Sequence, residues 1–338
     1  MKLVGIIDYF LSYLWITYWH LKSVLNIAPL FWKFCYNTCN SLFTRLQHTN
    51  NIDVSFMNYG YATRVPHSPP ENSELDKFIE SKQDKLKKDS PLNFNEVWNS
   101  VQLYAAVLST YEGDLKGKSI LEVGCGRGGG SVVVCSAAEP KSYAGIDISD
   151  QGIEICRQIY RNDLIPAGNK VFYVGSSMEL ENYFAPESFD VVLNVESAHC
   201  YPNFDKFLRG VFDLLKPGGM LLFADISPTI AWPDIKDTIT STGFQIIKQY
   251  NITTNVIHSL KTEVEPFLSK INSKSSSSYI GRMLMWLVNS QTVRVPLNAM
   301  IKGEGQYQIV SSRKPLQFNK QTSNLEGRQT LTHRNVSS

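Results

Sequence analysis

A glycine-rich turn is the strongest chemical signal in the sequence. The apolar run Ile120–Val123 leads into Gly124-Cys125-Gly126-Arg127-Gly128-Gly129-Gly130, and a helix-like stretch follows. Glycine lets a backbone turn tightly and approach a ligand that a Cβ would push away. Asp147 ends the next predicted strand, where an acidic side chain can accept hydrogen bonds from both hydroxyls of a ribose. Together these features predict a site for an adenosine-type nucleotide.

The glycine spacing alone does not choose among such nucleotides. Gly124, Gly126 and Gly129 also satisfy G-x-G-x-x-G, so an NAD-dependent oxidoreductase stays an alternative. Glu122 stands just before the first glycine, where dinucleotide domains usually carry a small apolar residue or a glycine. An acid at that strand end can reach the amino-acid portion of a ligand, so the context favours a nucleotide that carries one.

The elements that must hold this turn alternate between strands and helices, which is the signature of βαβ units. The pattern therefore predicts an α/β fold with a doubly wound, mostly parallel sheet over residues 113–314. Strands are expected at 119–123, 143–147, 170–175, 189–195, 220–226, 244–250 and 305–311, and helices at 95–111, 131–138, 230–242 and 256–271.

Two further segments carry a family resemblance. Phe189–Glu196 is typical of a fourth strand, and Leu214–Leu222 of a Pro-Gly-Gly turn into a fifth. With the glycine turn they resemble the Rossmann-like class I S-adenosylmethionine-dependent methyltransferases, which implies S-adenosyl-L-methionine as cofactor. Asn194–Pro202, Gly128–Gly130 and Phe56–Ala62 are similar to the phthiotriol/phenolphthiotriol dimycocerosates methyltransferases, which O-methylate a hydroxyl on a large lipid.

The resemblance implies how the cofactor is held. Glu122, Gly124 and Gly126 are expected at its methionine end, Asp147 at its ribose, and Asn194 beside the methyl group.

The adenine side departs from the family pattern. Ser176 stands where such enzymes often have an aspartate that binds the adenine amino group, and a hydroxyl accepts that hydrogen bond more weakly than a carboxylate. Met178 is expected to pack on the adenine ring.

Two side chains after the fourth strand are candidates for proton transfer. An aliphatic hydroxyl must lose its proton as it attacks, so a base is expected within hydrogen-bond reach. His199 is the first candidate, with a structural histidine as the alternative, and Glu196 is either a second base or the group that orients His199. A basic His199 favours O-methylation of a hydrophobic or lipid-like small molecule.

Other activities stay open at this point. A sterol-like C-methyltransferase and a small-amine N-methyltransferase are the alternatives among enzymes. A catalytically inactive cofactor-binding protein is the alternative outside them.

Residues 1–36 differ in composition from the rest of the chain. Leu3–Trp19 is apolar and rich in tyrosine and tryptophan, which settle at the depth of lipid headgroups, but it is slightly short for a full span and contains Asp8. We expect a membrane-associated N-terminal segment. A helix buried against the enzyme is the alternative.

Residues 37–112 are expected to form a cap and a linker. Tyr59 and Tyr61 stand far ahead of the nucleotide fold, which suits a lid over the substrate. The proline- and lysine-rich stretch 66–88 is interpreted as a charged linker, and the polar tail 315–338 as disordered.

Composition narrows the partners further. The formal net charge is only +2, so the charge of the chain does not indicate that it binds nucleic acid. The 6 cysteines follow no metal-ligand or disulfide spacing, so we expect no metal and a reduced, intracellular protein. We expect its first segment to place it at the cytoplasmic face of a membrane.

Overall fold

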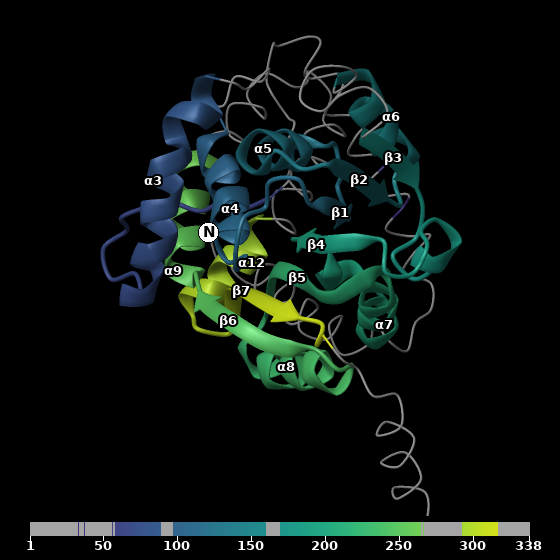
Figure 1. The fold of residues 1–338 in the computed structure, drawn as a ribbon. Coiled ribbons are helices and arrows are strands. Elements are labelled where there is room, and N and C mark those ends of the chain that lie inside the picture. Colours follow the sequence, from purple (N-terminus) through teal and green to yellow (C-terminus); the bar gives the residue numbers. More distant parts are fainter. Residues whose placement is uncertain are drawn as a thin grey trace, which may run out of the picture.

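A seven-stranded sheet forms the centre of the computed structural model, which describes residues 33, 37, 56, 58–88, 97–159, 170–264, 266 and 293–316. The strand order is β3-β2-β1-β4-β5-β7-β6 (Figure 1). The last strand, β7, runs antiparallel to β5 and β6, and the other neighbours are parallel. The strands are β1 (Ser119–Val123), β2 (Ser142–Asp147), β3 (Lys170–Val174), β4 (Phe189–Val195), β5 (Leu215–Pro228), β6 (Gln245–Asn251) and β7 (Gly305–Arg313).

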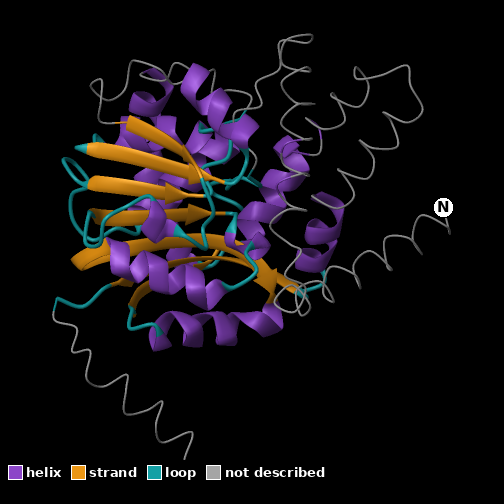
Figure 2. Ribbon diagram, turned by 90° about the vertical axis from the view of Figure 1, so that its right-hand side faces the viewer, coloured by secondary structure: helices purple, strands orange, loops and turns teal. Residues whose placement is uncertain are grey.

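Helices cover both faces of the sheet (Figure 2). Along β5, Leu222 and Ala224 join one core while Leu221 and Phe223 join the other, because successive strand residues point to opposite faces. The first core is covered by α3 (Ser73–Lys88), α4 (Trp98–Ser109), α5 (Gly129–Ala138), α6 (Asp150–Ile159), α9 (Thr253–Ser259) and α12 (Val295–Ile301), and the second by α7 (Phe204–Leu214) and α8 (Trp232–Ser241).

Short helical turns connect these elements. They are the 3₁₀ turns η1 (Pro70–Asn72), η3 (Leu180–Asn182), η4 (Ala198–Cys200) and η5 (Thr229–Ala231), and the π-helical turn η6 (Leu260–Val264). Two of them, η4 and η5, follow β4 and β5 at the carboxyl edge of the sheet, where ligands bind in folds of this kind.

The stretch interpreted as a charged linker instead contains the 16-residue helix α3. Leu75, Ile79 and Leu86 are buried, and their spacing places them on one face of the helix. Lysines fill the other faces, and Lys85 forms an ion pair with Glu139. The high charge of this stretch therefore belongs to the outer side of a packed helix.

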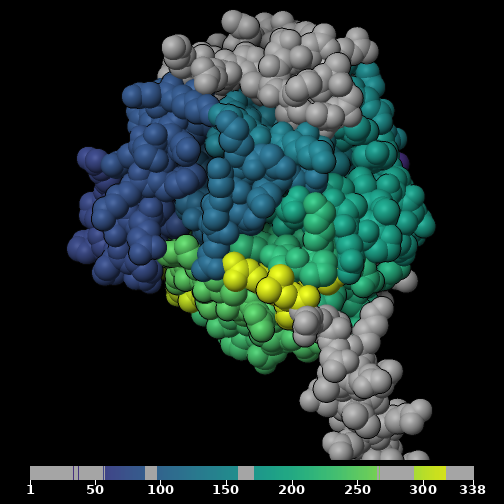
Figure 3. Space-filling view, in the orientation of Figure 1, coloured from purple at the N-terminus to yellow at the C-terminus, as the bar shows by residue number. Residues whose placement is uncertain are grey.

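The first helices and the last third of the chain meet at a common surface. The Asn72 amide donates to the backbone oxygen of Asn251 at 3.0 Å, and the Tyr250 hydroxyl donates to Glu74 at 3.2 Å. Figure 3 shows this contact between the purple-blue and green regions. The N-terminal segment that reaches the site is thus anchored on the C-terminal half of the sheet.

Most of residues 1–36 lie outside the described part of the chain, as does the tail from residue 317. The membrane association expected of the first segment therefore stays a prediction. Lys33, which is described, pairs with Asp150 at the start of α6 at 2.7 Å. Among the described helices, none has the length and apolarity needed to cross a membrane.

Candidate active site

The carboxyl ends of β1, β2, β3 and β4 open into one cavity, which we call the cofactor cavity. Ligands of doubly wound sheets bind at this edge. Its wall comprises residues from the glycine turn, the loops after β2, β3 and β4, the N-terminal segment and α4, among them Gly124, Gly126, Asp147, Ser176, Met178, Glu196, Ser197, Tyr201, Phe56, Asn58 and Tyr104.

Backbone conformation explains the glycines of the turn. Gly124, Gly126 and Gly128 have φ angles of +79°, +55° and +85°, in the left-handed region that side chains disfavour. A Cβ on Gly124 would also lie 2.3 Å from the Ser197 hydroxyl oxygen. The turn can therefore take this shape only with glycine at Gly124.

Asp147, the last residue of β2, lines the cofactor cavity. Its Oδ2 accepts a hydrogen bond from the Gly126 backbone at 2.9 Å, and its Oδ1 accepts one from the Ser149 backbone at 2.8 Å. Burial raises the pKa of the carboxyl, and these backbone donors partly oppose the rise. The two bonds orient both oxygens at the cavity wall.

We predict that Asp147→Ala weakens binding of S-adenosylmethionine by about 1–3 kcal/mol, because ribose hydroxyls lose a charged acceptor. Titration calorimetry measures this change. Asp150→Ala is the matched control, since that exposed carboxylate pairs with Lys33 and should leave affinity unchanged. Equal affinities for the two variants would remove Asp147 from the ribose site.

Glu122 lies behind the cavity wall. The carboxylate is fully buried and accepts hydrogen bonds from the hydroxyls of Tyr104, at 2.6 Å, and Tyr143. Burial raises its pKa to about 7, although both tyrosines counteract the shift. Tyr104 lines the cavity whereas Glu122 does not, so Glu122 positions a lining residue. Its direct contact with the cofactor stays a prediction.

Asn194, like Glu122, lies behind the wall of the cofactor cavity. Its amide nitrogen lies 2.9 Å from each of the Val123 carbonyl, the Ser197 hydroxyl and the Tyr201 hydroxyl. Ser197 and Tyr201 line the cavity, and Asn194 does not. The fully buried amide therefore ties the end of β1 to the loop after β4.

The loop after β3 brings both expected adenine residues to the cavity. Ser176 and Met178 line it, and the Ser176 hydroxyl accepts a hydrogen bond from the Met178 backbone at 3.1 Å. This bond fixes the serine within the loop and leaves its hydroxyl hydrogen available for a ligand.

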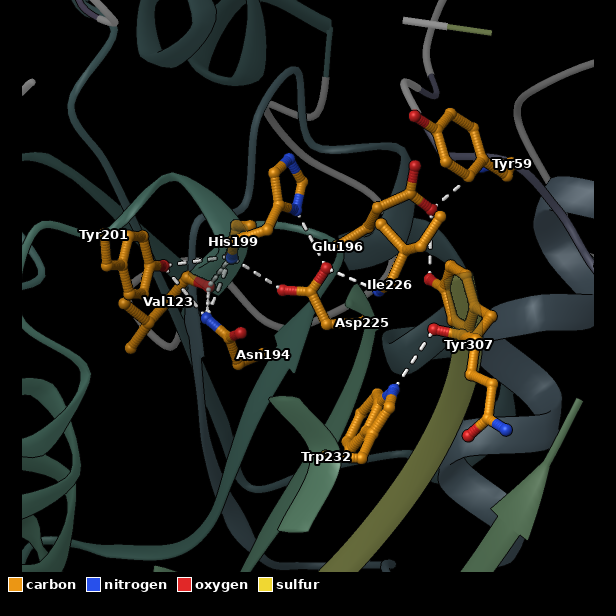
Figure 4. A network of polar contacts seen from close by, with 12 residues as sticks. Tyr59, Val123, Asn194, Glu196, His199, Tyr201, Asp225, Ile226, Trp232 and Tyr307 are labelled. Carbon is orange, nitrogen blue, oxygen red and sulfur yellow. Dashed lines mark hydrogen bonds and ion pairs between the residues drawn. The ribbon is translucent and has the colours of Figure 1, made fainter. Parts of the chain in front are cut away.

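Glu196 joins three distant parts of the chain at the cavity. Its Oε2 accepts hydrogen bonds from the Tyr59 backbone at 2.9 Å and from the Tyr307 hydroxyl at 3.0 Å (Figure 4). Its φ of +53° is strained for a residue with a side chain. Burial raises its pKa to about 8, so the neutral acid predominates at pH 7.

His199 pairs with Asp225, a residue inside β5. The two side chains meet through Nδ1 and Oδ1 at 2.8 Å, and the His199 backbone donates to Oδ2 at 2.9 Å (Figure 4). Burial disfavours the imidazolium, but neighbouring Cys200 and the Asp225 carboxylate outweigh it and raise the pKa of His199 well above its usual value. The carboxylate thus fixes the ring and stabilises its charge.

The two expected lid tyrosines have different surroundings. Tyr61 is fully buried and its hydroxyl donates to Asp76 at 2.7 Å, so it anchors the segment on α3. The half-buried Tyr59 contacts Glu196 through its backbone. Phe56 and Asn58 from the same segment line the cofactor cavity. The segment reaches the site as expected, and its lid role stays a prediction.

Similarity to known proteins agrees with this geometry. Residues 114–274 match a family model described as a methyltransferase domain. A fatty-acid O-methyltransferase of Mycolicibacterium smegmatis is 32% identical over 65% of this chain and 70% of its own length. The chain belongs to the class I S-adenosylmethionine-dependent methyltransferases. It is therefore an enzyme, which decides against both the oxidoreductase and the inactive binding protein.

Two other methyltransferases extend the comparison. A phthiotriol/phenolphthiotriol dimycocerosates methyltransferase of Mycobacterium tuberculosis is 34% identical over 51% of this chain and 61% of its own length. The solved phosphoethanolamine N-methyltransferase 2 of Haemonchus contortus, in complex with S-adenosylhomocysteine, has a TM-score of 0.52. It is 16% identical and covers 71% of this chain and 60% of its own, so it shows the fold alone.

The residues of the cofactor cavity fit the cofactor of this methyltransferase family. Asp147 would hold the ribose hydroxyls through its carboxylate, and the left-handed glycine turn brings backbone close to the cavity. Met178 would offer an apolar surface to adenine. When bound, S-adenosylmethionine supplies an electrophilic methyl group on a sulfonium.

Proposed function

We propose that this methyltransferase O-methylates a hydroxyl of a lipid-like acceptor, with His199 as the general base and Asp225 as its positioning residue. The observation that carries the proposal is the His199–Asp225 contact of 2.8 Å. An Nδ1–H that donates to Asp225 leaves the lone pair on Nε2, which can accept the proton of an attacking hydroxyl.

The surrounding residues support this division of roles. Glu196, with a pKa of about 8, is largely neutral at pH 7 and already accepts bonds from Tyr59 and Tyr307. It is therefore a poorer base than the neutral form of His199. The half-buried imidazole would also hold the acceptor oxygen in place for in-line attack.

A carboxylic acid is a second candidate acceptor. A relative is named fatty-acid O-methyltransferase, and a carboxylate is already ionised, so it needs no base. The electrostatic environment of His199 favours this second acceptor. Burial lowers the pKa of His199, but Cys200 and Asp225 outweigh burial and raise it well above its usual value, which widens the pH range in which the ring is cationic and would attract an anionic acceptor.

The pH dependence separates the two acceptors. For decanol, the rate of a single turnover should rise about tenfold per pH unit until His199 is deprotonated, at a pH above about 6.5. For decanoic acid, the rate should stay level or fall over the same range, since the imidazolium that attracts the acid is lost. Rapid-quench measurement of labelled methyl transfer, with saturating S-adenosylmethionine, records both profiles.

Glu196→Gln identifies which group causes the rise. Glutamine can accept the same bonds from Tyr59 and Tyr307 but does not titrate. The rise with decanol should therefore persist in this variant if His199 is the base. Loss of the rise would transfer the role of base to Glu196, and absence of methyl transfer to decanol would reject an alcohol acceptor of this kind.

A further inference from the structure

A second cavity lies between the end of β5 and the start of α8. Its volume of about 370 Å³ is in the range of small-molecule sites, roughly 300–1,000 Å³. Aromatic and aliphatic side chains form most of its wall, including Phe204, Phe223, Ile226, Trp232 and Ile235. Ile230, also in the wall, is 69% exposed and marks the side that opens to solvent.

The turn η4 separates this cavity from the cofactor cavity. Ser197 and Cys200 line the cofactor cavity, whereas Ala198 and His199 line the second one. The imidazole of His199 therefore stands at the border between them. Figure 4 shows Asp225 bonded to His199, while the indole of Trp232 in the apolar wall donates to the backbone oxygen of Gln306 at 3.2 Å.

Ser227 provides an independent sign of a ligand. It lines the second cavity and is 1% exposed, yet its hydroxyl has no hydrogen-bond partner among the residues that the structure describes. A buried hydroxyl without a partner is unfavourable because it has lost its hydrogen bonds to water and gained none in the protein. It shares a face of β5 with Asp225, about 7 Å along the strand. An oxygen on a bound ligand would satisfy it.

We propose that the second cavity binds the aliphatic chain of the methyl acceptor, and that Ser227 donates a hydrogen bond to an oxygen carried on that chain. The inference rests on the proposed function, because it places the reactive oxygen beside His199 at the border of the two cavities. The wall is mostly apolar, and its two carboxylates, Asp225 and Asp234, disfavour an anionic group in the interior of the cavity. The acceptor is accordingly an oxygenated lipid with its methylated oxygen at one end.

Bromine quenching tests the location of the chain without requiring methyl transfer. A terminally brominated decanol should quench tryptophan fluorescence on binding, because its bromine reaches Trp232 in the cavity wall. Trp232→Phe should remove the quenched component. Trp98→Phe is the matched control, since Trp98 lies on α4 and stacks with Lys87 instead, and it should retain the quenching. Full quenching in Trp232→Phe would overturn the proposal.

Filling the cavity provides a second test. Ala231 lines it, so Ala231→Leu places extra carbons in the space of the chain. The dissociation constant of the brominated decanol should rise by about tenfold or more, while that of S-adenosylmethionine stays the same. A change below about twofold in a variant of unaltered melting temperature would contradict the proposal.

The oxygen partner of Ser227 is tested with brominated decanediols that differ in the position of their second hydroxyl. At least one should bind wild-type protein about 2- to 10-fold more tightly than the mono-alcohol, and lose that gain in Ser227→Ala. The free variant should be as stable as wild type or more so, because it lacks a buried hydroxyl without a partner. A set of diols with no gain would refute the role of Ser227.

The experiments distinguish failure of the second cavity as the chain-binding site from failure of the proposed O-methylation. Quenching through Trp232 without methyl transfer to any alcohol would reject the proposed function and retain the cavity as a binding site for the chain. Methyl transfer that Ala231→Leu leaves unchanged would retain the function and reject the cavity as the acceptor site.

Discussion

Replacing His199 by glutamine is expected to lower the rate of methyl transfer to an alcohol by about 10²- to 10⁴-fold, the usual contribution of a positioned base. Glutamine retains the backbone bond to Asp225 but cannot take up the proton. Affinity for S-adenosylmethionine should stay near wild type, because His199 lies outside the wall of the cofactor cavity. Single-turnover rates and calorimetry measure the two effects separately.

Two further variants sharpen this test. His258→Gln, on the exposed side of α9, should leave the rate unchanged. Asp225→Asn removes a charge that raises the pKa of His199, so the rise in activity should move to lower pH. A rate for His199→Gln within a few-fold of wild type, with the same pH profile, would reject the general base and leave catalysis to alignment.

Gly124→Ala should reduce affinity for S-adenosylmethionine by about 100-fold or more and lower the melting temperature. Its φ of +79° and the 2.3 Å approach of a Cβ to the Ser197 hydroxyl each cost about 1–3 kcal/mol. The turn can escape the overlap only by moving, which displaces the backbone that bonds Asp147. Calorimetric titration and thermal unfolding measure both consequences.

Gly117→Ala distinguishes the effect of steric overlap of a Cβ from the effect of a strained φ angle. Gly117 has a similar φ of +72°, but a Cβ there would meet nothing within 4 Å. This variant should lose about 1–2 kcal/mol of stability and no cofactor affinity. Similar affinity losses at both positions would show that the packing around Gly124 is irrelevant to the site.

The strands were predictable where glycine or a polar residue marks their ends. β1 and β4 have the expected bounds, Ser119–Val123 and Phe189–Val195. β5 begins at Leu215, earlier than expected, because the Pro-Gly-Gly sequence continues the strand through a shift in its pairing with β4. Propensity favoured a turn there, and pairing with a neighbouring strand overrode it.

Residues that follow a strand were easier to place than residues inside one. Ser176 and Glu196 line the cofactor cavity because loops at the carboxyl edge face it, and Asp147, the last residue of β2, reaches the same edge. Glu122 and Asn194 belong to strands, where the direction of a side chain alternates at each residue, and both lie behind the wall. The spacing of motifs carries no information on that direction.

Asp225 is the functional candidate that the motifs did not reveal. It stands within the mostly apolar stretch Met220–Ile226, for which the sequence predicted only a strand. A lone carboxylate between Ala224 and Ile226 was nevertheless a usable signal, because burying a charge is unfavourable unless it has a partner. Its partner, His199, comes from the end of a neighbouring strand, a juxtaposition that only the fold supplies.

The hydrogen bonds of Glu196 have a consequence for how the enzyme is made. One carboxylate joins Tyr59 near the start of the described chain to Tyr307 in β7, the last strand. A ribosome that has synthesised the glycine turn, Asp147 and the His199–Asp225 pair has still not produced Tyr307, the second partner of Glu196. Synthesis proceeds from the N-terminus, so this contact at the cofactor cavity can form only after β7 has been made.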